Sequence, residues 1–135
     1  NALVGRLLAE LSQEDARKAF EASEIARLLA EKAPDNLASL RGFFSREPQA
    51  TTAALLQAIA ADGPGVSEED LRNLEIPTLI IGHDIDYIHP LSYAAGISQL
   101  IPGSRLVSVT PKAVSRAAYL KDFHKAITEF LETFL

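Results

Sequence analysis

The sequence predicts a helix-rich α/β protein with a small parallel sheet, and three observations support this class. Residues 3–61 are rich in alanine and leucine and repeat their apolar side chains at helical spacing. Two short apolar runs, at 78–82 and 105–109, are bounded by turn residues and enclose a segment with helical spacing. The final segment, Lys112 to Leu135, has the pattern of a long amphipathic helix.

Polar residues divide the first part into several short helices. Ser12, followed by Gln13 to Asp15, resembles a capping box. Pro34 to Asn36 indicates a helix end followed by a new N-cap, and Arg46 to Pro48 marks another break. The two helices expected next, at about 36–45 and 49–61, should bury apolar faces made of Leu37, Leu40, Phe43 and Phe44 in the first and Leu55, Leu56 and Ile59 in the second.

The strongest loop signal of the chain lies at Asp62 to Val66, and Ser67 after it should cap a short helix that ends near Leu74. We place an organisational boundary in this loop. It separates a helical segment, residues 1–66, from a βαβα segment, residues 67–135. The length of 135 residues fits one domain with a core of its own.

The second segment contains a βαβ unit. Strands at about 78–82 and 105–109 flank a helix at about 90–100, and such strands are expected to be parallel neighbours. The helix that follows should pack on the sheet through Ala113, Tyr119 or Leu120, Phe123, Ile127, Phe130 or Leu131, and Phe134.

Two strands alone make a poor sheet, because a parallel pair is normally buried on both faces and has neighbours at both edges. We therefore expect either self-association through an exposed strand edge, giving a dimer, or further sheet upstream in a longer protein. The chain contains no methionine, even at its first position, which is consistent with a piece excised from a longer protein.

Composition narrows the possible partners. The net charge is −5, with 8 Lys+Arg against 13 Asp+Glu in residues 1–75 and 5 against 5 in the rest. Without a basic stripe carrying interleaved aromatics, nucleic acid is not an expected partner. The sequence has neither a membrane-length apolar run nor a signal pattern, so we expect a soluble cytoplasmic protein that does not bind membranes. The absence of cysteine excludes disulfides and thiolate metal sites.

The segment from Ile76 to Pro90 carries the candidate site, because its apolar run ends at a glycine and is followed by His83, Asp84, Asp86 and His89. Ligands of open parallel sheets bind at the carboxyl ends of strands. Aspartates that follow strands also commonly form turns or cap the next helix. Two carboxylates and two imidazoles would suit zinc or manganese, but four such groups within seven residues indicate a turn, so we expect no metal and no other cofactor.

The order of these elements and the strings PTLIIG, DYIHP, LIPGSRLVSV and ITEFLETFL resemble the carboxy-terminal part of an α/β-hydrolase. The resemblance covers residues 71–135. It implies a partial α/β-hydrolase fold: a helical cap in residues 1–66, then the last two strands and helices of the core.

The resemblance also implies which residues belong to the active site. Asp86, four residues before Pro90, matches the triad acid, which orients the catalytic histidine. The spacing from Gly82 to the acid is one residue longer than usual, so Asp84 is an alternative. His83 and His89 would then be substrate-binding residues.

Two members of the triad are missing. The nucleophile elbow G-x-S-x-G occurs nowhere, as expected if the nucleophile lies upstream. The loop from Thr110 to Arg116, where the family has its histidine, contains none, and His124 lies further along, at an expected surface or half-buried position. The resemblance thus implies a serine-type hydrolase of small ester or acyl substrates that is inactive as this fragment. The alternatives are a non-catalytic hydrolase-like binding protein and a helical interaction domain with a βαβ appendage.

Overall fold

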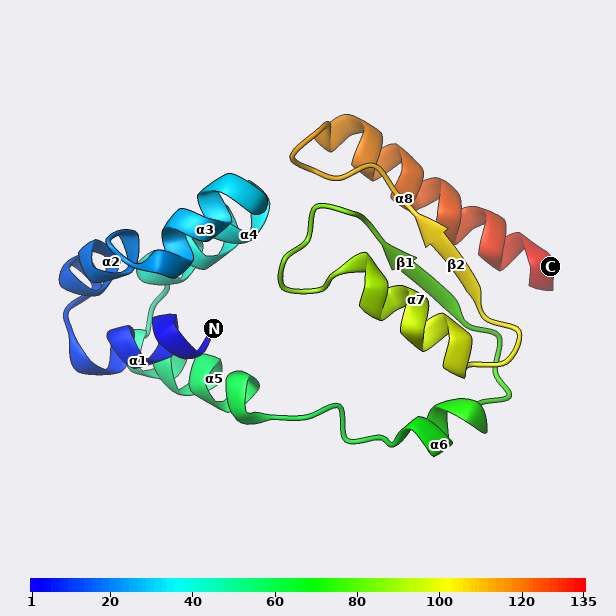
Figure 1. The fold of residues 1–135 in the computed structure, drawn as a ribbon, viewed down its shortest axis with the longest axis horizontal. Coiled ribbons are helices and arrows are strands. Elements are labelled where there is room, and N and C mark those ends of the chain that lie inside the picture. Colours follow the sequence, from blue (N-terminus) through cyan, green and yellow to red (C-terminus); the bar gives the residue numbers. More distant parts are fainter. The chain divides into compact units, whose positions relative to one another are not determined.

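The computed structural model describes residues 1–135, and the chain divides into two compact units, Asn1–Gly63 and Pro64–Leu135 (Figure 1). The division falls within the loop at 62–66. The protein is therefore organised as two units, where the chain length predicted a single domain. The structure is rich in helix and contains one small parallel sheet.

The first unit consists entirely of helices. These are α1 (Ala2–Glu10), α2 (Gln13–Glu21), α3 (Glu24–Lys32), α4 (Pro34–Arg41), the 3-10 helix η1 (Gly42–Ser45) and α5 (Gln49–Ala61). The predicted breaks near residues 34 and 46 are present. One boundary differs: α4 begins at Pro34 and not after Asn36, because proline suits the first helical position, where no intrahelical N–H bond is lost.

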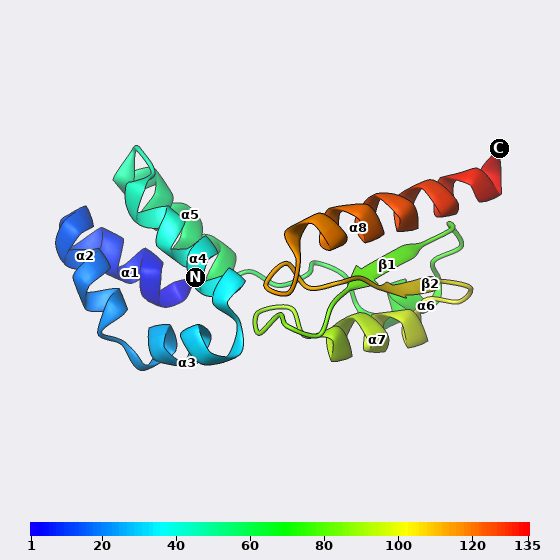
Figure 2. The same cartoon turned by 90° about the horizontal axis from the view of Figure 1, so that it is seen from above.

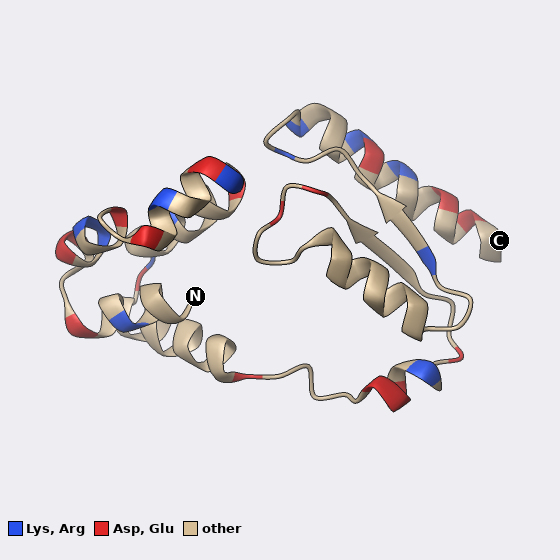
Figure 3. Ribbon diagram, viewed as in Figure 1, with Lys and Arg blue, Asp and Glu red and all other residues tan.

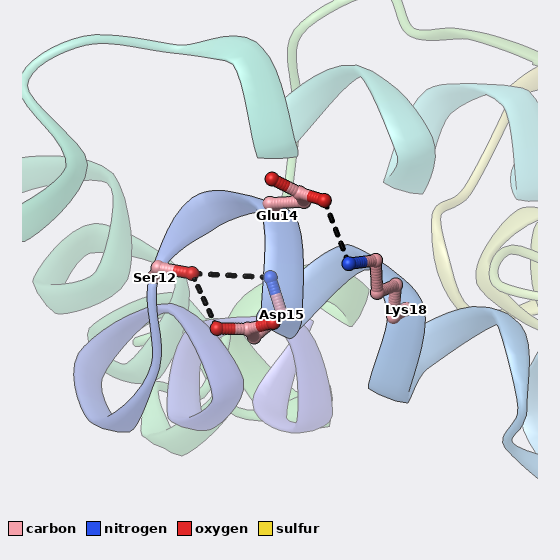
Figure 4. Close-up of polar contacts among 4 residues, drawn as sticks. All are labelled: Ser12, Glu14, Asp15 and Lys18. Atoms are coloured by element: carbon pink, nitrogen blue, oxygen red, sulfur yellow. Dashed lines mark hydrogen bonds and ion pairs between the residues drawn. The ribbon is translucent and has the colours of Figure 1, made fainter.

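Serine side chains cap two helices in each unit. Ser12 caps α2 as predicted: its Oγ accepts from the backbone N–H of Asp15 at 3.2 Å and donates to Asp15 Oδ2 at 2.8 Å (Figure 4). The same view shows the exposed Lys18–Glu14 ion pair at 2.6 Å, of a kind that contributes little to stability. Ser67 and Asp70 form a complete, reciprocal capping box. Ser23 caps α3 in the same way as Ser12, which the sequence reading missed.

The core of the first unit surrounds Phe20, which is fully buried and packs against Phe44 with ring centroids 5.4 Å apart. Leu37, Leu40 and Phe44 are buried and Phe43 is partly buried, so the predicted apolar face of this region is confirmed. The rest of the cluster is aliphatic: Val4, Leu8, Ala16, Ala26, Leu29, Ala33, Ala53 and Leu56.

The predicted buried face of α5 is wrong at two of its three positions. Leu56 is buried, but the side chains of Leu55 and Ile59 are half exposed. The helix packs on α1 where Gly5 allows close approach: a Cβ added at Gly5 would lie 3.0 Å from the Leu56 Cβ. This contact turns Thr52, Ala53 and Leu56 inward and leaves Leu55 and Ile59 outside.

The second unit contains every strand of the protein. Its elements are α6 (Glu68–Arg72), β1 (Leu79–Gly82), α7 (Leu91–Leu100), β2 (Arg105–Ser108), α8 (Arg116–Leu131) and the 3-10 helix η2 (Glu132–Phe134). The predicted βαβ unit is therefore present. The last helix begins at Arg116 and not near Lys112, because the Ser115 side chain caps it by accepting from the backbone N–H of Ala118.

The two strands pair in parallel, with Leu79 opposite Arg105 and Gly82 opposite Ser108. Helices α7 and α8 cover opposite faces of this sheet (Figure 2). Gly82 faces α7, where an added Cβ would lie 2.9 Å from Leu91 Cδ1 and 3.2 Å from Ala94 Cβ. Since strand side chains alternate, the next residue, His83, lies on the α8 face.

The helices of this unit bury the sheet only partly. Every residue of β1 is half-buried, and the fully buried apolar residues of this unit are Ile101, Val109 and Ala126. On the last helix, Tyr119, Phe123, Ile127 and Phe130 are half-buried, whereas Leu120, Leu131 and Phe134 are exposed. The predicted burial of Phe134 is wrong, since this residue lies beyond the sheet in η2, and Ala113 is exposed in the loop before α8.

Charged side chains are unevenly distributed over the helices. Among the α-helices, α5 and α7 carry none, whereas the others have Lys, Arg, Asp or Glu (Figure 3). Neither helix is buried on all sides, since α7 has no buried residue and α5 buries only Thr52, Ala53 and Leu56. No helix of the structure has the length and apolar character that crossing a membrane requires.

Neighbouring leucines of α5 test the packing of the first unit. Leu56→Ala should lower the free energy of unfolding by about 2–5 kcal/mol, because it leaves a cavity against α1. The matched change Leu55→Ala, at a side chain that is 51% exposed, should cost about 0.5 kcal/mol or less. Urea unfolding of the full chain, followed by far-UV circular dichroism, measures both. Equal losses would contradict the assigned face.

Candidate functional site

The loop after β1 holds the candidate residues, and Asp86 is its best-anchored side chain. Asp86 Oδ1 accepts hydrogen bonds from the backbone N–H groups of Ile88, at 2.9 Å, and His89, at 2.8 Å. The side chain is 18% exposed. Two bonds from one turn orient the carboxylate, and they are also the bonds by which an aspartate closes a turn.

His89 lies beside this carboxylate, with its Nδ1 3.5 Å from Asp86 Oδ2. The distance is long for a hydrogen bond, and the His89 side chain is 82% exposed, so the pair contributes little to stability. The other candidate acid, Asp84, faces solvent. Of the two aspartates, Asp86 is thus the one whose carboxylate the loop positions.

His83 lies at the other end of the loop and contacts α8. Its ring meets the ring of Tyr119 edge-on, with centroids 6.2 Å apart and planes at 89°. Its Nδ1 is buried and has no hydrogen-bond partner. The structure therefore brings His89 to Asp86 and places His83 against Tyr119.

The loop after β2 is anchored by Asp122 of α8. Thr110 donates to Asp122 Oδ2 from its hydroxyl, at 2.6 Å, and from its backbone N–H, at 3.0 Å. These bonds, first the hydroxyl and then the backbone N–H, lower the pKa of Asp122, with the charges of Lys121 and Lys125 adding to the effect. The Asp122 carboxylate therefore stabilises the folded chain fully above the ordinary carboxyl pKa. This stabilisation is lost as the pH falls through the lowered pKa of Asp122.

No histidine enters the site from this second loop, and His124 is exposed on α8 as expected. The residue that the loop does present is Lys112, whose ammonium lies 4.7 Å from the centroid of the Tyr119 ring. Tyr119 in turn stacks on Phe123 at 5.7 Å. Sequence reasoning missed Lys112 because a single loop lysine has no pattern, and it treated Tyr119 only as a packing residue.

The structure brings together no group of three or more His, Asp or Glu side chains that could hold a metal ion. Comparison with protein-family models, curated proteins and solved structures finds no match to this chain. The local geometry and chemistry therefore carry the functional argument.

The role of Asp86 in its turn can be measured by hydrogen exchange. Asp86→Ala removes the acceptor of two amides, so the N–H groups of Ile88 and His89 should exchange faster. Asp86→Asn keeps the oxygen in place and should largely preserve protection. Asp84→Ala, at the exposed neighbour, is the control and should change neither amide. Unaltered exchange in Asp86→Ala would show that the carboxylate does not hold the loop.

Proposed function

We propose that this chain is the carboxy-terminal part of an α/β-hydrolase, a serine-type ester or acyl hydrolase of the cytoplasm, in which Asp86 is the triad acid. The observation that supports this proposal is the set of contacts that hold the Asp86 carboxylate. Oδ1 is held by the two backbone N–H groups of its turn, and Oδ2 faces an imidazole nitrogen at 3.5 Å. An acid held in this way can fix the tautomer of a histidine and stabilise the imidazolium.

The proposed enzyme needs two groups that the described residues do not supply. There is no G-x-S-x-G sequence for a nucleophile, and the loop after β2 contains no histidine. Both would come from another part of the hydrolase, while His83 and His89 would contact the ester or acyl substrate. The chain by itself would be inactive.

A non-catalytic binding or interaction protein is the second candidate. It is favoured by the bonds of Asp86 to its own turn, which a purely structural aspartate also makes, and by the absent histidine. In this case the same end of the sheet would bind a ligand without cleaving it. The sequence of the whole reading frame separates the candidates, because an elbow serine favours the enzyme.

An esterase assay tests the catalytic proposal. The isolated chain should hydrolyse short nitrophenyl esters no faster than buffer, since it lacks a nucleophile elbow. Turnover that Asp86→Asn abolishes would show that a complete site is present in this chain. Turnover that Asp86→Asn leaves unchanged would assign the activity to a different site and remove Asp86 from the proposal.

We further propose that the isolated chain self-associates through a free strand edge. β1 and β2 are the only strands of the sheet, so each has one unpaired edge, and their residues are at most half-buried. Light scattering should give a mass above 14.6 kDa that rises with protein concentration. A monomer at high concentration would refute edge pairing.

A further inference from the structure

Side chains from the loops after both strands meet on one aromatic ring. His83 follows β1 and contacts the edge of Tyr119, while Lys112 follows β2 and places its ammonium 4.7 Å from the centroid of the same ring. Phe123 extends the aromatic surface along α8. This cluster therefore lies at the carboxyl end of the sheet, where ligands of parallel sheets bind.

Two polar atoms of this cluster, Lys112 Nζ and His83 Nδ1, have no ion-pair or hydrogen-bond partner within the protein. No carboxylate lies within ion-pair distance of the Lys112 ammonium, and the nearby Asp122 accepts from Thr110. The contact with Tyr119 positions this charge without neutralising it. His83 Nδ1 is buried and has no hydrogen-bond partner, so Nε2 is the ring nitrogen left to contact a ligand.

We propose that the carboxyl end of this sheet binds a small organic carboxylate, held by the Lys112 ammonium and the His83 Nε2–H beside the Tyr119–Phe123 rings. A carboxylate offers two acceptor oxygens to these two donors, and its single charge matches that of Lys112. Its organic part would pack on the aromatic surface. A phosphate carries more charge than this single cation balances.

This inference deepens the proposed function and rests on it only in calling the ligand a substrate or product. Hydrolysis of an ester releases a carboxylate, and the cluster would hold that product at the end of the sheet where the Asp86 loop begins. Binding itself requires no nucleophile, so it can be measured in the isolated chain whatever the outcome of the esterase assay.

Titration of the full chain with sodium benzoate, followed by amide NMR, tests the proposal. We expect saturable shifts centred on His83, Lys112 and Tyr119, with a dissociation constant of the order of millimolar. Lys112→Gln should weaken binding about tenfold, as expected for loss of a charge-assisted bond. His83→Phe, which keeps the ring contact but removes the N–H, should also weaken it.

One matched control and one change of the ring locate the effect. Lys125→Gln removes an exposed lysine that pairs with Glu129 on α8, and it should leave benzoate affinity unchanged. Tyr119→Leu removes the ring beneath Lys112 and should weaken benzoate binding.

The proposal is overturned if the shifts do not saturate, or if Lys112→Gln binds like the original chain. Inorganic phosphate binding more tightly than benzoate would overturn the assignment to a carboxylate. Should His83→Phe fail to fold, Lys112→Gln still decides the outcome, because its side chain is exposed. If benzoate does not bind, the proposed role of Asp86 is unaffected. In turn, the result of the esterase assay does not decide whether benzoate binds.

Discussion

The parallel pairing of β1 with β2 is the constraint on which the rest of the second unit depends. Parallel strands end at the same edge, so the pairing places the loop at 83–90 and the loop at 109–115 on one side of the sheet. Gly82 favours close packing of α7 on β1, because an added Cβ would crowd Leu91 Cδ1 and Ala94 Cβ. The Thr110–Asp122 bonds then tie the second loop to α8.

These contacts position the candidate site on a sheet whose strands are only partly covered. Strand residues are only partly buried, and neither strand has a second neighbour. Parallel sheets are usually buried on both faces, and the free edges have a cost unless something pairs with them. A larger hydrolase sheet and self-association of this chain are both proposed for the same reason. Either one would pair the free backbone groups at the strand edges.

The two candidate functions use the same residues differently. In a hydrolase, the orientation of the Asp86 carboxylate would serve an imidazole supplied by another segment. In a binding protein, the Asp86 turn would be structural, and the cluster around Tyr119 would be the functional part. The Lys112–Tyr119 contact is compatible with both, because a charge held over a ring at the end of a sheet can orient an anion with or without subsequent chemistry.

The sequence by itself determined the βαβ unit, the break before α5 and the caps at Ser12 and Ser67, because short-range turn and capping chemistry specifies these features. It also pointed to Asp86, whose role as a triad acid stays a prediction. Tertiary structure alone decided which face of α5 is buried, since that depends on the distant Gly5, and which side chains surround His83. Lys112 and Tyr119 carry no local signal of proximity. They meet because strand pairing and the docking of α8 bring together residues from separate loops and helices.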